Sequence, residues 1–482
     1  MKSIRVNTFY NLLKTTLSLV FPLISFAYTS RILEADGLGK IQFSQSIITY
    51  FTLIAMLGIK NYGTREGAKR RENKEQLSQF TCEIFVLNML STAVSYLLFF
   101  VSLLVVPKFH DYQSLLLIFS VMIAFTSMGM EWLYGALEEY RYITLRSLAF
   151  QLISIVLLLT LVKSKQDLYI YAWILCLSSV GSNLLNLIHA RKFLVIKKYK
   201  LHFKRHIKPI LILFAMELSI SLYSNLDSTM LGFMTNDWEV GQYSAAVKIN
   251  HVLVSVMCSV GVVLLPRLSY YFEKKMMNEF NAVAKRAFNC LLLLAVPSAL
   301  GLIVLSAPTI RLFSGAGYDA AVPTMMIMAP VVVVIPLNTL INSQLLLPIG
   351  KEKWALASTC TSAGVNLLFN SLLIPLLQRN GAAIGTIMAE TSGLVVCLLL
   401  ARKKFAIRDF FTRCWQYIVA ALPILPIGWL LQQYISNGIL FIIVTIAVSV
   451  AVYFTLLMLM KNETCRFLWG EGMAYLRRFR KK

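Results

Sequence analysis

The sequence has few charged residues, and this scarcity limits the kind of protein that it can encode. Only 14% of its 482 residues are charged, whereas 57% are hydrophobic. A water-soluble protein of this length needs more polar side chains to cover its surface. The composition therefore excludes a soluble globular protein and indicates that lipid surrounds the chain.

Paired cysteines and the short motifs of common enzymes are also missing. The eight cysteines show no CxxC spacing, and most lie in apolar stretches, so neither a disulfide framework nor a zinc site is expected. The sequence contains no DxD, HExxH, GxSxG or P-loop pattern. We therefore predict that the chain is not an enzyme and holds no cofactor or metal. Coupling of its activity to an H⁺ or Na⁺ gradient is left open.

Long hydrophobic stretches recur along the whole sequence. Each is long enough to cross the hydrocarbon core of a membrane, about 30 Å thick, as a helix. Helices are expected because lipid offers no partner to a free backbone group. The first stretch is too long for a signal peptide, and we interpret it as an uncleaved helix. Fourteen spans are predicted, near residues 7–30, 40–60, 78–105, 112–136, 143–162, 168–190, 208–233, 240–265, 285–307, 322–347, 355–377, 381–401, 411–432 and 437–460.

Lysine and arginine gather in alternate loops, which sets the orientation of the spans. With the N-terminus inside, the inner segments hold 37 Lys and Arg residues and the outer loops hold 7. Because basic residues are retained on the cytoplasmic side, both termini are predicted to be cytoplasmic. The formal charge of +23 thus reflects topology, and no nucleic-acid partner is expected. The basic tail at 461–482 either lies against anionic lipid headgroups or is a frayed end.

A long basic loop and an internal repeat predict a division into two lobes. The loop from Arg191 to Lys208 carries eight basic residues and follows the sixth span. The string LGKIQFSQSI from Leu38 opens the second span, and VGQYSAAVKI from Val240 opens the eighth, at an offset of 202 residues. Both predicted lobes start inside, so the repeat is parallel, about an axis along the membrane normal.

Several strings in both halves resemble one family of membrane exporters. In the first half they are SRILEADGLGKIQFSQSI from Ser30, GIKNYGTREGAKRR from Gly58 and EWLYGALEEYRYITLRS from Glu131. In the second half they are VPSALGLIVLSAPTIRLFSGAGYDAAVP from Val296 and NGAAIGTIMAE from Asn380. Together they resemble the Wzx-type polysaccharide flippases of the multidrug/oligosaccharidyl-lipid/polysaccharide (MOP) exporter superfamily.

The resemblance implies an all-α integral membrane fold, with two six-helix lobes around a central cavity and two peripheral helices. Its substrate would be an undecaprenyl-pyrophosphate-linked sugar repeat unit. Surface polysaccharide or O-antigen synthesis would be its setting, with a polymerase and chain-length proteins as partners. The expected parts are the N-terminal lobe at 1–190, a cytoplasmic linker at 191–207, the C-terminal lobe at 208–405, the peripheral helices at 406–460 and the tail at 461–482.

Ionisable groups inside a membrane span are costly, so each is a candidate functional residue. Moving a pyrophosphate requires cations, and moving sugars requires amides and hydroxyls. In the eighth span, Lys248 and His251 share one helical face with two serines, which predicts a substrate-binding stripe. Asp227 in the seventh span is expected at a similar depth to Lys248. We predict an ion pair between them, which serves coupling or only neutralises two buried charges.

Other polar residues within the spans are candidates for the same cavity. Lys14 either contacts substrate or extends to the headgroups, and Arg31 is a phosphate contact or an interfacial anchor. Sugar-binding candidates share amide or hydroxyl groups and equally suit helix-to-helix contacts: Gln42, Gln45, Thr49, Thr52, Asn338 and Asn342. The seventh span offers one polar face for the cavity and for coupling: Glu217, Ser221, Ser224, Asn225 and Ser228.

Five further charged residues within the spans or at their ends are considered. Glu390 is central in the twelfth span, and either takes part in coupling by protonation or is hydrogen-bonded to a neighbouring helix. Arg65 and Arg267 occupy equivalent positions and form a cytoplasmic gate, or are simply retained inside. Glu83 and Glu131 lie near inner span ends and are expected to reach the interface.

We interpret the chain as a transporter that works by alternating access in a bacterial cytoplasmic membrane. A cation-coupled multidrug antiporter is the alternative within the superfamily, although such proteins usually have twelve spans. A polymerase or glycosyltransferase for the same lipid-linked sugars belongs to another class, and generally needs a sizeable loop or domain that this chain lacks. A scaffold without transport activity would have no reason to bury charges.

Overall fold

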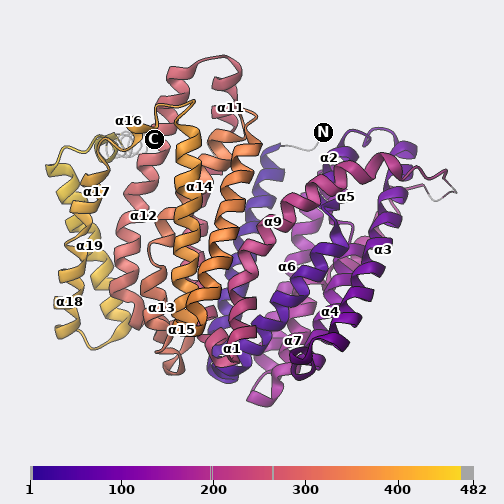
Figure 1. The fold of residues 1–482 in the computed structure, drawn as a ribbon, viewed down its shortest axis with the longest axis horizontal. Helices are drawn as coiled ribbons and strands as arrows, with labels where there is room; N and C mark the ends of the chain where they lie inside the picture. The colour runs from indigo at the N-terminus through magenta and orange to yellow at the C-terminus, as the bar shows by residue number, and fades with distance from the viewer. Residues whose placement is uncertain (1–3, 196, 198, 263–264, 468–469, 471–482) are drawn as a thin grey trace, which may run out of the picture. The chain divides into compact units, whose positions relative to one another are not determined.

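The structure is a computed structural model that describes residues 4–195, 197, 199–262, 265–467 and 470. All regular elements among these residues are helical, which confirms the predicted all-α class. The chain divides into two compact units, unit 1 (Met1–Gly241) and unit 2 (Gln242–Lys482). Figure 1 shows unit 1 from indigo to magenta, and its colours continue through orange to yellow along unit 2.

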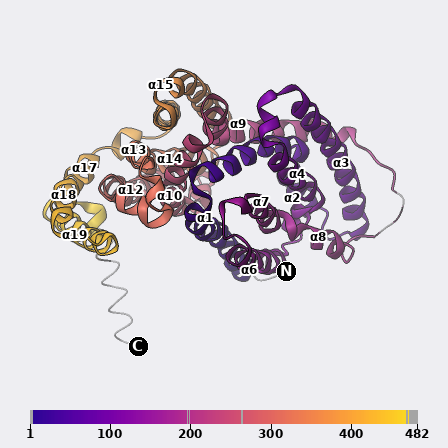
Figure 2. The same cartoon turned by 90° about the horizontal axis from the view of Figure 1, so that it is seen from below.

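Unit 1 is built from helices that pack side by side, and Figure 2 shows several of them nearly end on. Its α-helices are α1 (Ile4–Met56), α2 (Ile59–Ala68), α3 (Lys74–Val105), α4 (Gln113–Met128), α5 (Glu131–Ala136), α6 (Tyr140–Leu161), α7 (Leu168–Cys176), α8 (Asn183–Ala190) and α9 (Lys204–Met234). Shorter 3₁₀ and π segments are η1 (Pro107–Tyr112), η2 (Lys165–Asp167) and η3 (Leu177–Gly181). α10 (Asp237–Val262) begins in unit 1 and continues into unit 2.

Unit 2 continues with long helices, and its last three lie at one edge beside α12 (Figure 1). Its α-helices are α11 (Leu265–Glu273), α12 (Met277–Ser314), α13 (Ala321–Met328), α14 (Val331–Thr339), α15 (Glu352–Ala401), α16 (Ile407–Phe410), α17 (Cys414–Ala421), α18 (Ile424–Tyr434) and α19 (Gly438–Leu459). The shorter segments are η4 (Ala316–Tyr318) and the π-helix η5 (Leu340–Leu346).

The surface of these helices is suited to lipid. Large apolar side chains face outward, such as Leu104 on α3, which is 80% exposed. On the same helix, Glu83 has no exposed surface. Apolar side chains outside and polar ones inside are the arrangement that a lipid environment favours. The chain is therefore a multi-pass membrane protein.

Nine helices of the described residues are long and apolar enough to cross a membrane, or ten if one bent pair counts as a span. Two of these nine contain a residue with non-helical backbone angles, Glu34 in α1 and Gln378 in α15. Both residues fall where the sequence predicts an outer turn between two spans. The predicted number of fourteen spans is compatible with these helices and stays a prediction.

Two helices of unit 1 are interrupted at the same level. Met130, with a φ of 41°, separates α4 from α5, and the π-helix η3 interrupts the path from α7 to α8. The side chain of Asn183 donates to the carbonyl oxygen of Phe125 at 3.1 Å, and Asn186 donates to that of Gly129 at 2.7 Å. Asn186 thus provides a partner for the Gly129 carbonyl at the end of α4, and Asn183 adds a second donor to the Phe125 carbonyl, which also accepts from the Gly129 backbone.

Two glycines allow α10 to approach the second half of α1. A Cβ atom on Gly39 would overlap the carbonyl oxygen of Asp237, and a Cβ atom on Gly241 would overlap that of Ala35. The two contacts are equivalent, because 35 and 237, like 39 and 241, are 202 positions apart. This is the offset of the predicted repeat, so the repeat-related segments meet each other in a symmetric way.

The compact units divide at residues 241 and 242, beyond the expected linker at 191–207. The described residues between α8 and α9 form turns and irregular backbone, as expected of a linker. However, α9 packs on α1 and α2 within unit 1. The compact units are defined by which helices pack together, whereas the lobes are predicted from the repeat in the sequence. The two divisions need not coincide, so the predicted lobe boundaries stay a prediction.

Candidate functional site

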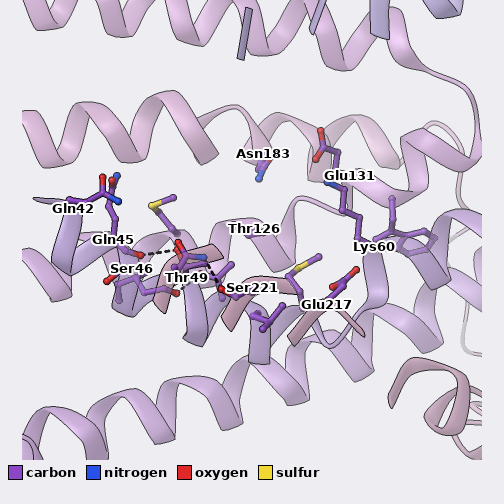
Figure 3. Close-up of a pocket in the computed structure, with 17 residues that line it drawn as sticks. Gln42, Gln45, Ser46, Thr49, Lys60, Thr126, Glu131, Asn183, Glu217 and Ser221 are labelled. Carbon is purple, nitrogen blue, oxygen red and sulfur yellow. Dashed lines mark hydrogen bonds between the residues drawn. The ribbon is translucent and has the colours of Figure 1, made fainter. Parts of the chain in front are cut away.

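Unit 1 contains a pocket of about 500 Å³ between α1, α2, α4, α5, α8 and α9. Most of its lining residues have polar or charged side chains, and Figure 3 shows how the labelled ones are arranged. The lining residues are Gln42, Gln45, Ser46, Ile48, Thr49, Thr52, Leu53, Met56, Lys60, Met122, Thr126, Glu131, Trp132, Asn183, Glu217, Ser221 and Asn225.

The spacing of polar residues along α1 and α9 explains this lining. Gln42, Gln45, Thr49 and Thr52 recur every three or four residues on α1, and therefore share one face of the helix. On α9, Glu217, Ser221 and Asn225 recur every four residues. The hydroxyl groups of Thr49 and Thr52 donate to carbonyl oxygens of their own helix, which leaves their oxygens able to accept.

Charged groups gather at one end of the pocket. Figure 3 shows Lys60, Glu131 and Glu217 at this end and the amides of Gln42 and Gln45 at the other. The side-chain amide of Asn61 donates to Glu217 Oε1 at 2.8 Å, which holds the carboxylate in place. Lys60 acts on the same carboxylate electrostatically. In the orientation predicted from the loop charges, this end of the pocket faces the cytoplasm.

Two buried polar atoms of the lining have no hydrogen-bond partner among the described residues: the indole nitrogen of Trp132 and the hydroxyl oxygen of Ser221. Trp132 is 2% exposed, and its ring packs on Gly63, where a Cβ atom would lie 2.5 Å from the ring. Buried polar groups are normally paired, so an unpaired donor in a pocket wall is available to a ligand. A sugar hydroxyl provides the matching acceptor.

Seven of the residues predicted for the cavity line this pocket: Gln42, Gln45, Thr49, Thr52, Glu217, Ser221 and Asn225. Their contact with a substrate remains a prediction. Three residues that line the same pocket are not among the candidates that the sequence pattern indicates: Lys60, Trp132 and Asn183. Lys60 is one of the basic residues that indicate the cytoplasmic side. It also follows the polar face of the second span, and this position could have indicated that it lines the same cavity. For Trp132 no pattern in the sequence reveals that its nitrogen is unpaired.

In unit 2 the structure brings together Asn338, Asn342 and Glu390. The Asn338 amide donates to Glu390 Oε2 at 3.3 Å, and the Asn342 amide donates to Asn338 Oδ1 at 2.7 Å. Cys397 contacts Asn342 Oδ1 at 3.0 Å, so this cysteine also belongs to the cluster. Asn342 lies in the π-helix η5, a local distortion that is frequent at functional sites. The contacts fit the alternative in which Glu390 is hydrogen-bonded to a neighbouring helix, while its role in coupling stays a prediction.

The predicted stripe of α10 is repeat-equivalent to the pocket face of α1. At the offset of 202, Ser46 corresponds to Lys248 and Thr49 to His251. Lys248 is half-buried and His251 is exposed within the described residues. Asp227, which is buried, belongs to unit 1 and Lys248 to unit 2, so the ion pair between them stays a prediction.

The remaining candidates are not among the residues that line the pocket. Arg65 is exposed, 3.4 Å from Glu66 and over the ring of Tyr62, and exposed Arg267 donates to the Tyr271 hydroxyl at 3.2 Å. Arg31 is exposed on α1. Lys14 lies on α1, in the part of that helix whose side chains are not described. The gate role of the two inner arginines and the substrate contacts of the other two residues stay predictions.

One expectation for a glutamate near a span end is wrong. Glu131 lines the pocket, and its expected contact with the interface stays a prediction. Glu83 is completely buried, and its Oε2 accepts from Arg205 at 2.6 Å and lies 2.7 Å from His206 Nε2. The other nitrogen of His206 is 2.7 Å from the Tyr62 hydroxyl. Partners from the following segments therefore reach into the bundle, so the carboxylate does not need water.

Polar pockets and clusters inside long, broken, lipid-exposed helices define a polytopic membrane transport protein. No group of His, Cys, Asp and Glu suited to a metal occurs among the described residues. The sequence pattern of the family described as polysaccharide biosynthesis protein matches residues 4–272. This is more than half of the chain, and the chain belongs to that family. A second pattern, MatE, matches residues 213–372.

Known proteins agree with this assignment. The chain is 24% identical over 404 residues to a candidate O-antigen transporter of Escherichia coli (strain K12), which covers 83% of this chain and 96% of that protein. The fold of this chain resembles that of the lipid II flippase MurJ in its inward closed conformation. The TM-score is 0.76 and the identity 16%, over 95% of this chain and 99% of that one.

An inward-facing MATE family multidrug transporter of the MOP superfamily gives a TM-score of 0.61 and 13% identity, over 81% of this chain and 95% of that chain. The likeness to both solved structures concerns the fold. The family pattern over residues 4–272, with the MatE pattern at 213–372, confirms the resemblance that the sequence strings indicate. All three relatives are transporters or flippases by name, in agreement with the prediction that the chain is not an enzyme.

Proposed function

We propose that the chain is a flippase that moves undecaprenyl-pyrophosphate-linked oligosaccharide repeat units across a bacterial cytoplasmic membrane by alternating access. The observation that carries the proposal is the pocket of unit 1, which presents amides and hydroxyls from several helices inside a membrane bundle. Such groups replace the water around sugar hydroxyls, which is the main cost of moving a glycan through hydrocarbon. Membership of the polysaccharide biosynthesis protein family supports the same substrate class.

The repeat suggests how the substrate divides between the two halves. The α1 face carries neutral Ser46 and Thr49, and the equivalent positions of α10 carry Lys248 and His251. We assign sugar contacts to Gln45 and Asn225 and phosphate contacts to Lys248 and His251, because cations bind phosphate oxygens strongly. Asn338, Asn342 and Glu390 are further candidates for sugar contact and coupling.

The remaining parts of the proposal concern location and partners. Both termini are assigned to the cytoplasm by the loop charges, and the membrane is the bacterial inner membrane. A polymerase and chain-length proteins would take up the flipped units for O-antigen or other surface polysaccharide synthesis. An H⁺ or Na⁺ gradient is the proposed source of energy.

The test uses purified protein in liposomes with a fluorescent undecaprenyl-pyrophosphate oligosaccharide and a membrane-impermeant quencher. Wild-type protein should make additional label accessible. Lys248→Ala should slow this movement about tenfold or more, because a charge-assisted contact to phosphate is lost. Lys404→Ala, which removes an exposed lysine in the segment after α15, is the matched control and should behave as wild type.

A multidrug antiporter is the second candidate, because the MatE pattern covers residues 213–372. The same liposomes distinguish the two functions. Protein that expels a cationic dye in exchange for protons or Na⁺, and leaves the lipid-linked sugar in place, would be an antiporter, and the flippase proposal would be wrong.

A further inference from the structure

Lys108 binds the end of α9 at the side of unit 1 that the loop charges assign to the outside. It lies in η1, between α3 and α4, and its ammonium group donates to the carbonyl oxygens of Gly232, Phe233 and Thr235. The first two belong to the last turn of α9, whose carbonyl groups have no partner within the helix. The helix dipole also favours a cation at this end. Lys108 therefore satisfies the end of a helix that is distant in the sequence.

The same segment also holds the first turn of α10. The hydroxyl group of Tyr112, the last residue of η1, donates to Asp237 Oδ1 at 2.5 Å, and Asp237 is the first residue of α10. The backbone carbonyl of Asp237 lies against Gly39 of α1. The segment η1 itself packs on α3 and α4. The connection between α9 and α10 is thus attached to η1 by two side chains and to α1 by a close backbone contact.

Phe43 fills the space between these polar contacts. Its side chain is completely buried, and its ring centroid lies 4.8 Å from that of Tyr112 and 5.3 Å from that of Phe233. The Lys108 nitrogen lies 5.8 Å from the centre of the same ring. Phe43 directly follows Gln42, which lines the end of the pocket opposite to the charged residues (Figure 3). The contacts around Lys108 therefore lie beside the outer end of the pocket.

The polar contacts of η1 can open at a modest cost. Lys108 and Asp237 are half-buried, in contrast to Glu83, which has no exposed surface. Water can therefore replace the lost partners of the ammonium group, the carboxylate and the helix carbonyls when η1 and α10 separate. Such contacts are strong enough to favour one conformation and weak enough to be broken in each transport cycle.

The continuity of α10 links these contacts to movement of the units. This helix, Asp237–Val262, begins in unit 1 and continues into unit 2. A change of angle between the two units must therefore bend α10 or release its first turn from unit 1. Bending would break backbone hydrogen bonds that lipid cannot replace, whereas release breaks contacts that water can replace.

We propose that Lys108 and Tyr112 form an outer latch. While they bind the connection between α9 and α10, the outer end of unit 1 is closed, and their release lets the first turn of α10 separate when the protein opens outward. The proposal rests on the alternating access proposed above, and adds the residues that hold the outer side closed.

The experiment measures outward opening by thiol labelling and needs no lipid-linked sugar. In a variant without the eight native cysteines, Gln45→Cys places one thiol in the pocket lining. An impermeant maleimide is added to intact cells or to inverted membrane vesicles. Lys108→Met should raise labelling from outside at least about fivefold and lower it from inside, because the closed state loses charge-assisted hydrogen bonds. Tyr112→Phe should act in the same direction, but more weakly.

Lys163→Met is the matched control. Lys163 also lies in an outer loop, but it donates to the carbonyl oxygen of Leu159 in α6, the helix that directly precedes it, so labelling from both sides should stay unchanged. Unchanged labelling from outside in Lys108→Met would overturn the latch. Increased labelling from both sides would also overturn it, because the contacts would then only stabilise the fold. A failure of the flippase function would instead appear as absent flipping in liposomes, with the labelling result intact.

Discussion

Glu83 is a buried carboxylate of unit 1 that contacts three residues near the start of α9. Its oxygen atoms receive hydrogen bonds from Arg205 and the backbone of His202, and lie beside His206. Through His206 the contact extends to Tyr62 on α2. The start of α9 is thus attached to α2 and α3, and α9 carries Glu217, Ser221 and Asn225 into the pocket.

Removing this carboxylate should therefore loosen unit 1. We expect Glu83→Ala to lower the free energy of unfolding by about 2 kcal/mol, because buried donors lose their acceptor, although half-exposed Arg205 regains water. The matched control is Glu75→Ala on the same helix, which breaks an exposed pair with Lys197 and should cost less than about 0.5 kcal/mol. Thermal unfolding in detergent measures both, and equal effects would contradict the structural role of Glu83.

Single residues also show which parts of the pocket lining can be predicted from the sequence. The spacing of Gln42, Gln45, Thr49 and Thr52 predicts a polar face, and that face does line the pocket. Lys60 was interpreted as a loop charge because retention of basic residues explains any lysine at an inner span end equally well. The unpaired nitrogen of Trp132 depends on packing against Gly63, 69 positions away, which no local pattern contains.

At the scale of the element, the helices turn within one residue at predicted outer loops. Glu34 and Gln378 have φ angles of 56° and 51°, and helix resumes immediately after each. The sequence predicts these turns from their polar and glycine-containing composition, but it predicts a longer gap after the first span. A single residue with a positive φ is sufficient to turn the chain from one span into the next. The composition of the segment does not reveal which residue adopts this conformation.

A positive φ is unfavourable for residues with a Cβ atom, so replacing one of them with glycine should relieve strain. We expect Gln378→Gly to raise the free energy of unfolding by up to about 1 kcal/mol. Gln416→Gly, in the helical interior of α17, is the contrasting change and should be destabilising. A lower unfolding temperature in Gln378→Gly would show that the contacts of the Gln378 side chain stabilise the fold by more than the positive φ destabilises it.

The crossing of α1 and α10 depends on the absence of two Cβ atoms. Gly39→Ala and Gly241→Ala should each separate the helices, since the obstructing atoms belong to the backbone and cannot rotate away. We expect each to reduce the yield of folded protein and the flipping rate. Gly364→Ala in α15 has free space around it and should be neutral or slightly stabilising. Wild-type behaviour of both crossing variants would mean that the close approach is dispensable.

At the scale of the molecule, the all-helical class and the multi-pass character follow from composition, and the structure confirms both. The extent of the compact units does not follow from it, because α9 packs on α1 and α2 through contacts between distant segments. The orientation in the membrane rests on the loop charges, and 37 basic residues against 7 give a clear expectation.

Labelling of single cysteines tests this orientation in a variant without the eight native ones. Ser436→Cys lies in the exposed connection between α18 and α19 and should react with an impermeant maleimide on intact cells. Lys404→Cys, in the exposed segment after α15, should react only after the membrane is opened. The reverse pattern would place both termini outside and would invert the proposed direction of the pocket.

The symmetric contact of Gly39 and Gly241 has the form of an interface between two identical subunits, in which each partner presents the same surface to the other. In a homodimer the two surfaces would have to carry the same side chains, whereas in a single chain the two copies can differ. A symmetric homodimer offers two identical half-sites, but a lipid-linked glycan has sugars at one end and phosphates at the other. Within this chain the two copies do differ, because the repeat positions of Ser46 and Thr49 are occupied by Lys248 and His251.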